Sequence, residues 1–96
     1  MCSDEQARRF FVSGRVQGVG YRYFAANAAE ELRIGGYVRN LPDGRVEVYA
    51  IGTRDQLRQF AQELRRGPAL ARVNDVAEAE AEILSDHRSG FSVTVR

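Results

Sequence analysis

The sequence places a glycine-rich loop between an apolar strand and a helix. The loop reads Gly14-Arg15-Val16-Gln17-Gly18-Val19-Gly20-Tyr21-Arg22 and follows the apolar run Phe10-Phe11-Val12. The first N–H groups of a helix have no acceptor within the helix, and with the N–H groups of such a loop they can surround a phosphate. Glycine permits the positive φ angles and the close backbone approach that this requires. The loop, with glycines at 14, 18 and 20, is therefore a candidate anion site.

Arg22 is the residue that makes an anion the more specific interpretation. A cation at a helix N-terminus opposes the helix dipole, at a cost of about 0.3–1 kcal/mol. A bound anion would reverse that sign, because charge-assisted hydrogen bonds contribute roughly 1.5–3 kcal/mol each. The alternative is a tight strand-to-helix turn with a solvated arginine. Short glycine patterns are weak evidence, so the loop alone leaves both interpretations open.

Hydrophobic periodicity predicts two helices. The first runs from Tyr21 to about Ile34, with an apolar stripe at four-residue steps, and the glycine pair at 35–36 ends it. The second begins after Thr53, whose side chain and that of Gln56 have the spacing of a capping box. Its apolar face is Leu57, Phe60, Ala61 and Leu64, and Gly67-Pro68 stop it after two arginines that suit its C-terminal dipole.

Five strands are predicted around these helices. Residues 73–84 contain alanine and glutamate, which favour helix, but their strict alternation would gather no apolar face on a helix, so we interpret them as an exposed edge strand. Leu41-Pro42-Asp43-Gly44 is a turn signal that closes a hairpin, and residues 85–90 form another turn. The predicted strands are residues 7–14, 36–40, 45–51 and 73–84, and a last strand with Phe91, Val93 and Val95 on one face.

This order of elements predicts the fold class. It is β-α-β-β-α-β plus an additional C-terminal strand, which indicates a ferredoxin-like α+β sandwich with an antiparallel sheet and two helices on one face. We expect one domain over residues 1–96, with residues 1–6 as a flexible N-terminal extension, and Cys2 as an exposed, inert thiol within it.

The topology brings Asn40 towards the glycine loop. In a split β-α-β unit the first two strands run parallel, so their C-terminal ends lie at the same edge of the sheet. The loop follows the first of these ends, and Asn40 is at the second. A carboxamide can donate and accept hydrogen bonds, so it could orient a water molecule. Asparagine is also common before a turn, and this simpler role remains open.

Composition and residue spacing exclude several classes of function. Arginine and lysine number 14 against 13 acidic residues, a net charge of +1, which predicts no nucleic-acid or membrane partner. The single cysteine excludes an intrachain disulfide, no His/Cys/Asp cluster has metal-ligand spacing, and His87 is expected to be a solvated loop residue. No Gly-x-x-x-x-Gly-Lys-Ser/Thr motif and no apolar run of membrane-spanning length is present, so cytoplasm is the expected location.

The chain resembles the acylphosphatase family at the two places singled out above. One family motif is matched by residues 14–22, and the other by Gly36-Tyr37-Val38-Arg39-Asn40-Leu41-Pro42-Asp43-Gly44-Arg45-Val46, with Gly52 at the expected spacing. The segment 67–73 looks like the family's link from the second helix to the fourth strand. The resemblance covers about residues 8–96, and two long motifs in order are much more specific than one glycine loop.

The resemblance implies an enzyme that hydrolyses the carboxyl–phosphate bond of an acyl phosphate without a metal or other cofactor. In this family's pattern Arg22 matches the arginine that binds the substrate phosphate, and Asn40 matches the residue that orients the attacking water. The phosphate cradle is matched by the backbone of Arg15, Val16, Gln17, Gly18, Val19, Gly20 and Tyr21, which leads to Arg22. Inorganic phosphate or a similar anion is the implied ligand of the loop. Tyr21 stands where phenylalanine is also frequent, which removes no group that the chemistry needs.

Two non-catalytic alternatives share the predicted topology. RNA-recognition domains stack bases on aromatic residues of their central strands, but the strand at 45–51 carries only Tyr49. A ferredoxin-like binding or regulatory module for a small anionic ligand is harder to exclude, because fold does not fix function. The glycine loop with Arg22 favours the enzyme. We expect a free-standing, monomeric domain.

Overall fold

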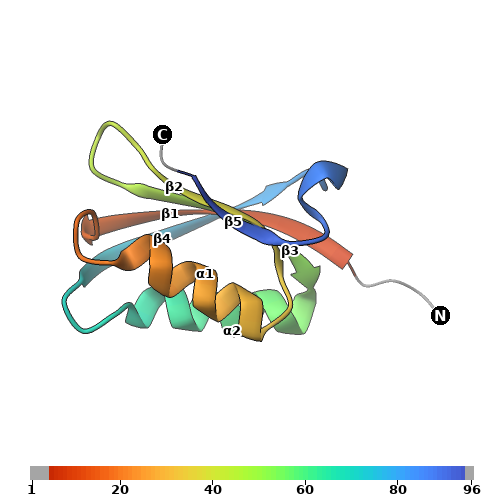
Figure 1. Ribbon diagram of the computed structural model, residues 1–96, viewed down its shortest axis with the longest axis horizontal. Coiled ribbons are helices and arrows are strands. Elements are labelled where there is room, and N and C mark those ends of the chain that lie inside the picture. Colours follow the sequence, from red (N-terminus) through yellow and green to blue (C-terminus); the bar gives the residue numbers. More distant parts are fainter. Residues whose placement is uncertain (1–4, 95–96) are drawn as a thin grey trace.

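The computed structural model describes residues 5–94, and the two helices lie side by side on one face of a five-stranded sheet (Figure 1). This confirms the ferredoxin-like α+β sandwich. The elements in chain order are β1 (Glu5–Arg15), α1 (Tyr21–Glu31), β2 (Gly35–Asn40), β3 (Val46–Thr53), α2 (Arg54–Arg66), β4 (Arg72–Ala81), the 3-10 helix η1 (Ser85–His87) and β5 (Phe91–Thr94).

The sheet has the strand order β4-β1-β3-β2-β5, and it is mixed rather than antiparallel as predicted. β5 pairs with β2 in parallel, with Val93 opposite Val38, while every other neighbouring pair is antiparallel. The reason lies in the connection after β4. The chain reverses direction, but it crosses to the far edge of the sheet instead of pairing with β4, and there the reversed direction is that of β2.

Helix α1 ends three residues earlier than predicted. Arg33, not a glycine, takes the left-handed conformation that stops it, with φ of 61°. The N–H of Arg33 donates to the carbonyl of Glu30 (3.1 Å) and the N–H of Ile34 to that of Ala29 (2.8 Å), the two bonds of a Schellman motif. The glycine pair at 35–36 begins β2 instead.

The predictions of helix α2 and of an edge strand β4 are confirmed, but β4 ends at Ala81, three residues before its predicted end at Leu84. The Thr53 hydroxyl accepts from the Gln56 N–H (3.1 Å), and the Gln56 side chain accepts from the Thr53 N–H (2.7 Å), which completes the capping box. Gly67 follows the helix with φ of 68°. Residues 72–81 form an exposed edge strand paired with β1, despite their helical propensity.

The chain ends differ in detail from the prediction. β1 begins at Glu5, two residues before the predicted start, so part of the predicted extension is strand. Cys2 was predicted to lie in a flexible terminus, and Val95 was predicted to lie in the last strand. Both residues are outside the part of the chain that the structure describes. The predicted turn at 85–90 contains η1.

The core lies between the sheet and the two helices. Its central fully buried side chains come from alternate positions of the strands and from one face of each helix, and they include Phe10, Val12, Val38, Val48, Ala25, Phe60 and Leu64. The rings of Phe10 and Phe60 meet edge to face, with centroids 6.0 Å apart. Val16 in the loop and Tyr21 at the start of α1 belong to the same buried cluster, so core packing holds this helix start at the edge of the sheet where the predicted site lies.

Candidate active site

The glycine loop connects β1 to α1 and leaves the start of the helix open. Gly20 precedes the helix with φ of 83°, without a side-chain cap, and the first turn of α1 has no acidic residue. The N–H of Phe24 is bonded to the Gly20 carbonyl (3.0 Å), so the N–H groups before it have no acceptor in the helix. A Cβ at Gly18 or Gly20 would meet no atom within 4 Å. Glycine is therefore required there by the backbone conformation, with φ of 74° and 83°.

Gly14 has a different role from the other loop glycines. It lies at a β-bulge between β1 and β4, and a Cβ at this position would be 2.1 Å from the Arg72 carbonyl oxygen. It lets two strands approach each other, which is a packing role and not a ligand-binding one.

Arg22, the second residue of α1, is half-buried and is held by the last strand. Its Nη1 donates to the carbonyl oxygen of Thr94 at the end of β5 (2.8 Å). A guanidinium carries five N–H donors, so this bond orients the group and leaves others for an anion. No sequence pattern indicates a role for Thr94, because its contribution is a backbone carbonyl.

Asn40 is the last residue of β2, and alternation along the strand puts it on the same face as the core residue Val38, the face covered by the helices. Its Oδ1 is buried and accepts no hydrogen bond from any residue between 5 and 94. A buried amide oxygen normally has a donor, and one without a protein partner is suited to bind a ligand or water.

One cavity of about 300 Å³ brings these groups together. It is lined by Val16, Gly18, Gly20, Tyr21, Arg22, Tyr23, Asn40 and Val93. The loop and Asn40 thus meet at one edge of the sheet, as the topology predicted; in Figure 1 the β1–α1 loop and the β2–β3 hairpin are both at the left end. Arg15, Gln17 and Val19, which were predicted as part of the cradle, are not among its lining residues.

The side chain of Gln17 joins the loop to the β2–β3 hairpin. Its Nε2 donates to the carbonyl oxygens of Leu41 (2.8 Å) and Arg45 (2.9 Å), which flank the turn immediately after Asn40. The two halves of the site are therefore tied by one side chain. No local pattern predicts this contact, which joins residues 24 and 28 positions apart.

Tyr21 joins the end of the loop to helix α2. Its ring is buried, and its hydroxyl donates to the Leu64 carbonyl near the end of α2 (2.7 Å). Burial raises the pKa of the Tyr21 hydroxyl well above its ordinary value, so it remains a protonated donor. The hydroxyl satisfies a carbonyl that the helix end leaves without an N–H partner.

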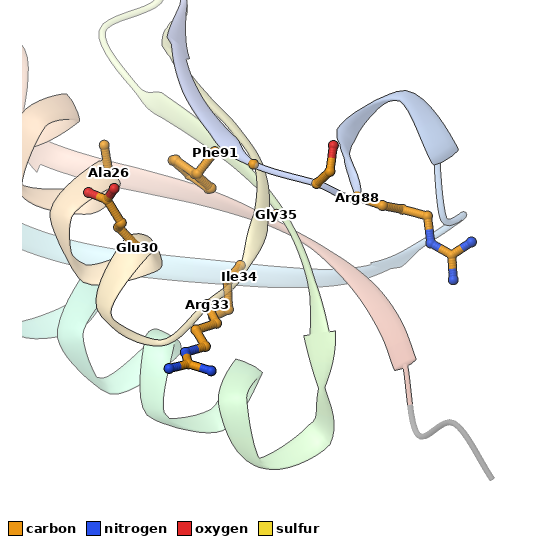
Figure 2. A pocket seen from close by; sticks show the side chains of 9 residues that line it. Ala26, Glu30, Arg33, Ile34, Gly35, Arg88 and Phe91 are labelled. Atoms are coloured by element: carbon orange, nitrogen blue, oxygen red, sulfur yellow. The ribbon is translucent and has the colours of Figure 1, made fainter. Parts of the chain in front are cut away.

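A second cavity, of about 350 Å³, lies between the end of α1 and the chain before β5 (Figure 2). Arg88 borders it, but its guanidinium points away from the other labelled side chains and pairs with Glu5. Neither the glycine loop nor Asn40 lines this cavity, so it is separate from the predicted site.

The face of the sheet away from the helices does not resemble an RNA-binding surface. Tyr49 is fully buried; its ring stacks on Tyr37 (5.4 Å), and its hydroxyl is bonded to the Leu84 N–H (2.7 Å) and the Glu82 carbonyl. His87 is half-buried against both rings, at 5.1 and 5.9 Å, and is not the solvated loop residue expected from sequence. The chain after β4 crosses over Tyr49, so this ring is not available to stack on a base.

Buried charge on that face is paired within the sheet. Glu47 is 4% exposed and lies 2.6 Å from Nε of Arg39 and 2.9 Å from Nε of Arg9, the latter without an aligned N–H. A hydrogen bond and charge from Glu47 raise the pKa of Arg39.

Within residues 5–94 no group of three or more His, Cys, Asp or Glu side chains could hold a metal ion. No helix in the same range is long and apolar enough to span a membrane.

Comparison with known proteins identifies the class of protein that this fold and site define. The family model described as acylphosphatase matches residues 8–93. A protein of Solibacter usitatus named acylphosphatase is 54% identical over 83 residues, which is 86% of each chain. One of Archaeoglobus fulgidus is 52% identical over 77 residues, 80% of this chain and 86% of the relative.

Solved structures show the same similarity. The structure of an acylphosphatase from Coxiella burnetii superimposes with a TM-score of 0.88 at 37% identity, and the match covers 95% of this chain and 94% of that one. The chain belongs to the acylphosphatase family. Its activity is the hydrolysis of acyl phosphates.

Proposed function

We propose that the cavity formed by the loop, Arg22 and Asn40 is where this enzyme hydrolyses its acyl phosphate. The observation that carries the proposal is the unpartnered Oδ1 of Asn40 in the same cavity as Arg22 and the open start of α1. The phosphate is bound by backbone N–H groups of the 15–22 loop and by the guanidinium. These donors carry the positive charge and positive dipole end that a phosphoryl group needs.

Arg22 binds the non-bridging phosphate oxygens. Its bond to the Thr94 carbonyl holds the guanidinium in place before substrate arrives, so little conformational freedom is lost on binding. Charge on the phosphoryl oxygens in the transition state is stabilised by the same donors, which is the main task of a protein in phosphoryl transfer.

Asn40 orients the attacking water. Its Oδ1 accepts a hydrogen bond from the water, which places the water oxygen for attack on phosphorus. The P–O bond to the acyl group breaks, and the carboxylate leaves with the bond's electron pair. An amide is not a strong base, so the water's proton passes to the substrate phosphate. A pH–rate profile that reveals an essential protein base near neutrality would contradict this step.

The reaction needs neither metal nor organic cofactor in this proposal. A mixed anhydride has a good leaving group, so positioning and electrostatic stabilisation are sufficient. Inorganic phosphate, the product, is expected to bind in the loop. We further propose a monomeric protein located in the cytoplasm, and the single cysteine, which excludes an intrachain disulfide, is in keeping with a reducing compartment.

The test is phosphate release from benzoyl phosphate in the presence of a chelator. Wild type is expected to turn over, and Arg22→Ala is expected to lose roughly a thousandfold in kcat/KM, in the range found when one preorganised transition-state donor is removed. Asn40→Ala is expected to lose about a hundredfold or more, because the attacking water is no longer positioned. Arg54→Ala, which removes a cation from the first turn of α2 instead, is the matched control and should keep full activity. Circular dichroism checks the fold of each variant.

Three results would contradict parts of the proposal. An active Asn40→Ala variant would remove the role of the carboxamide, and an inactive wild type that still binds phosphate would favour a non-catalytic binding module. Loss of turnover on adding chelator would contradict metal independence.

A further inference from the structure

We propose that Tyr23 and Val93 form an apolar contact surface for the acyl group, so that the enzyme prefers aromatic or bulky apolar acyl phosphates to acetyl phosphate. This inference rests on the proposed function of the cavity. It concerns the part of the substrate that the loop, Arg22 and Asn40 do not bind.

Tyr23 is an unusually exposed aromatic residue at the edge of the cavity. It is 75% exposed, and it follows Arg22 directly in the first turn of α1. A single exposed aromatic residue needs no explanation by itself. Tyr23, however, lines the same cavity as Arg22 and Asn40, so its ring is within the space that a substrate would enter.

Val93 lies across the cavity on a different element. It pairs with Val38 in the parallel β2–β5 ladder, two residues before Asn40, and parallel neighbours in register point to the same face of the sheet. Its side chain is 38% exposed although it lies on the face that carries the core. Two exposed apolar side chains therefore border the cavity from helix and sheet.

The chemistry of the remaining lining supports the same division. Only Arg22 and Asn40 contribute an ionic or amide side chain, and the hydroxyl of Tyr21 is already bonded to Leu64. The other lining residues are glycine, valine and Tyr23. Ligand sites commonly combine a few polar groups that fix one part of a ligand with apolar walls that bind the rest. With the phosphate held by the polar groups, the apolar wall is left for the acyl part.

The test compares kcat/KM for benzoyl phosphate and acetyl phosphate in wild type and variants, because intrinsic reactivity cancels when their ratio is compared between variants. Tyr23→Ser is expected to lower the benzoyl-to-acetyl ratio about tenfold, a size typical of one lost apolar contact in a substrate pocket. The change should appear mainly in KM for benzoyl phosphate. Tyr23→Phe keeps the ring and should keep the ratio, and the isosteric Val93→Thr should lower it by a smaller factor.

Two controls separate this contact from general damage. Ile83 is an apolar residue with an exposed fraction of 39%, similar to that of Val93, and it follows the C-terminal end of β4, away from the cavity. Ile83→Ser should therefore leave the ratio unchanged. The inhibition constant of inorganic phosphate should be the same in Tyr23→Ser and wild type, because phosphate lacks an acyl group.

The outcomes also separate this inference from the proposed function. If wild type hydrolyses both substrates and Tyr23→Ser leaves their ratio unchanged, or lowers both rates equally, the acyl surface is wrong and the hydrolytic site stands. If wild type hydrolyses neither, the proposed function fails and the inference fails with it.

Discussion

The two helices of this protein begin in opposite ways. Helix α2 starts with a complete capping box between Thr53 and Gln56, and Asp55 lies in its first turn. Helix α1 starts after Gly20 with no side-chain cap, no acidic residue in its first turn, and Arg22 where a cation is unfavourable. Every feature that stabilises the start of α2 is missing at the start of α1.

The difference indicates what each helix end is for. At α2 the protein satisfies its own N–H groups, which stabilises the fold. At α1 those groups have no acceptor within the helix and the buried Oδ1 of Asn40 has no donor among residues 5–94, and in the proposed function a ligand supplies both. The proposed binding site is thus the place where the sequence departs from the features that normally stabilise a helix start.

Ligand linkage provides the largest test of this contrast. Inorganic phosphate at one hundred times its dissociation constant is expected to raise the free energy of unfolding of wild type by about 2.7 kcal/mol. Arg22→Ala should lose most of this stabilisation at the same phosphate concentration, while Arg54→Ala should keep it. Urea unfolding with and without phosphate measures the effect. Equal stabilisation of wild type and Arg22→Ala by phosphate would show that the start of α1 is not an anion site.

A variant without the N-cap of α2 tests whether the start of this helix serves stability alone. Thr53→Ala should lower the free energy of unfolding by about 1 kcal/mol, because the Gln56 N–H loses its acceptor. Activity on benzoyl phosphate should not change, since this helix end lies outside the site. Thr53→Ser retains the hydroxyl and should be close to wild type. A drop in kcat/KM for Thr53→Ala at full folding would break the division between the two helices.

The C-terminal ends of the two helices also differ, with a smaller expected effect on the free energy of unfolding. α2 is followed by Gly67 with φ of 68°, whereas α1 is stopped by Arg33 with φ of 61°. Left-handed backbone is unfavourable for arginine, so Arg33→Gly should raise the free energy of unfolding by about 0.5–1 kcal/mol. Glu31→Gly, in the last helical position, should lower it instead. Thermal and urea unfolding give the sign, and a destabilised Arg33→Gly would mean that the arginine side chain has a role of its own.

The hairpin turn beside Asn40 should give the smallest effect. The Arg45 N–H, 3.1 Å from the Asp43 carboxylate, lowers the pKa of that carboxyl below its ordinary value of 3.8. The charged form is therefore favoured by folding, so its stabilisation is present above pH 3.8 and is lost as the pH falls through the lower folded value. Asp43→Asn should be slightly less stable than wild type at pH 7, and the difference should shrink by pH 3. A gap that widens in acid would contradict this sign.

The site illustrates how far sequence reasoning reaches. Spacing and topology placed Arg22 and Asn40 at one edge of the sheet, and the cavity contains both. The family pattern implied a role for the Gln17 backbone in the cradle, which stays a prediction, but nothing in the sequence indicated that the Gln17 side chain bonds to the carbonyls beside the hairpin turn. That contact depends on how two distant segments are placed, and no pattern within either segment contains it.

The sequence by itself determined the features that rest on neighbouring residues. These are the alternation that makes residues 72–81 a strand, the capping box at Thr53, and the glycines that open the start of α1. Each follows from backbone geometry or from hydrogen bonds within a few positions, so a local pattern is sufficient.

Only the tertiary structure decided which edge of the sheet receives β5, and much of the site follows from that choice. Pairing with β2 brings the Thr94 carbonyl to Arg22 and Val93 to the border of the cavity. It also carries the chain across Tyr49, where His87 becomes half-buried. A short strand of alternating residues fits either edge equally well by its own pattern, and packing against α1 and β2 selects one.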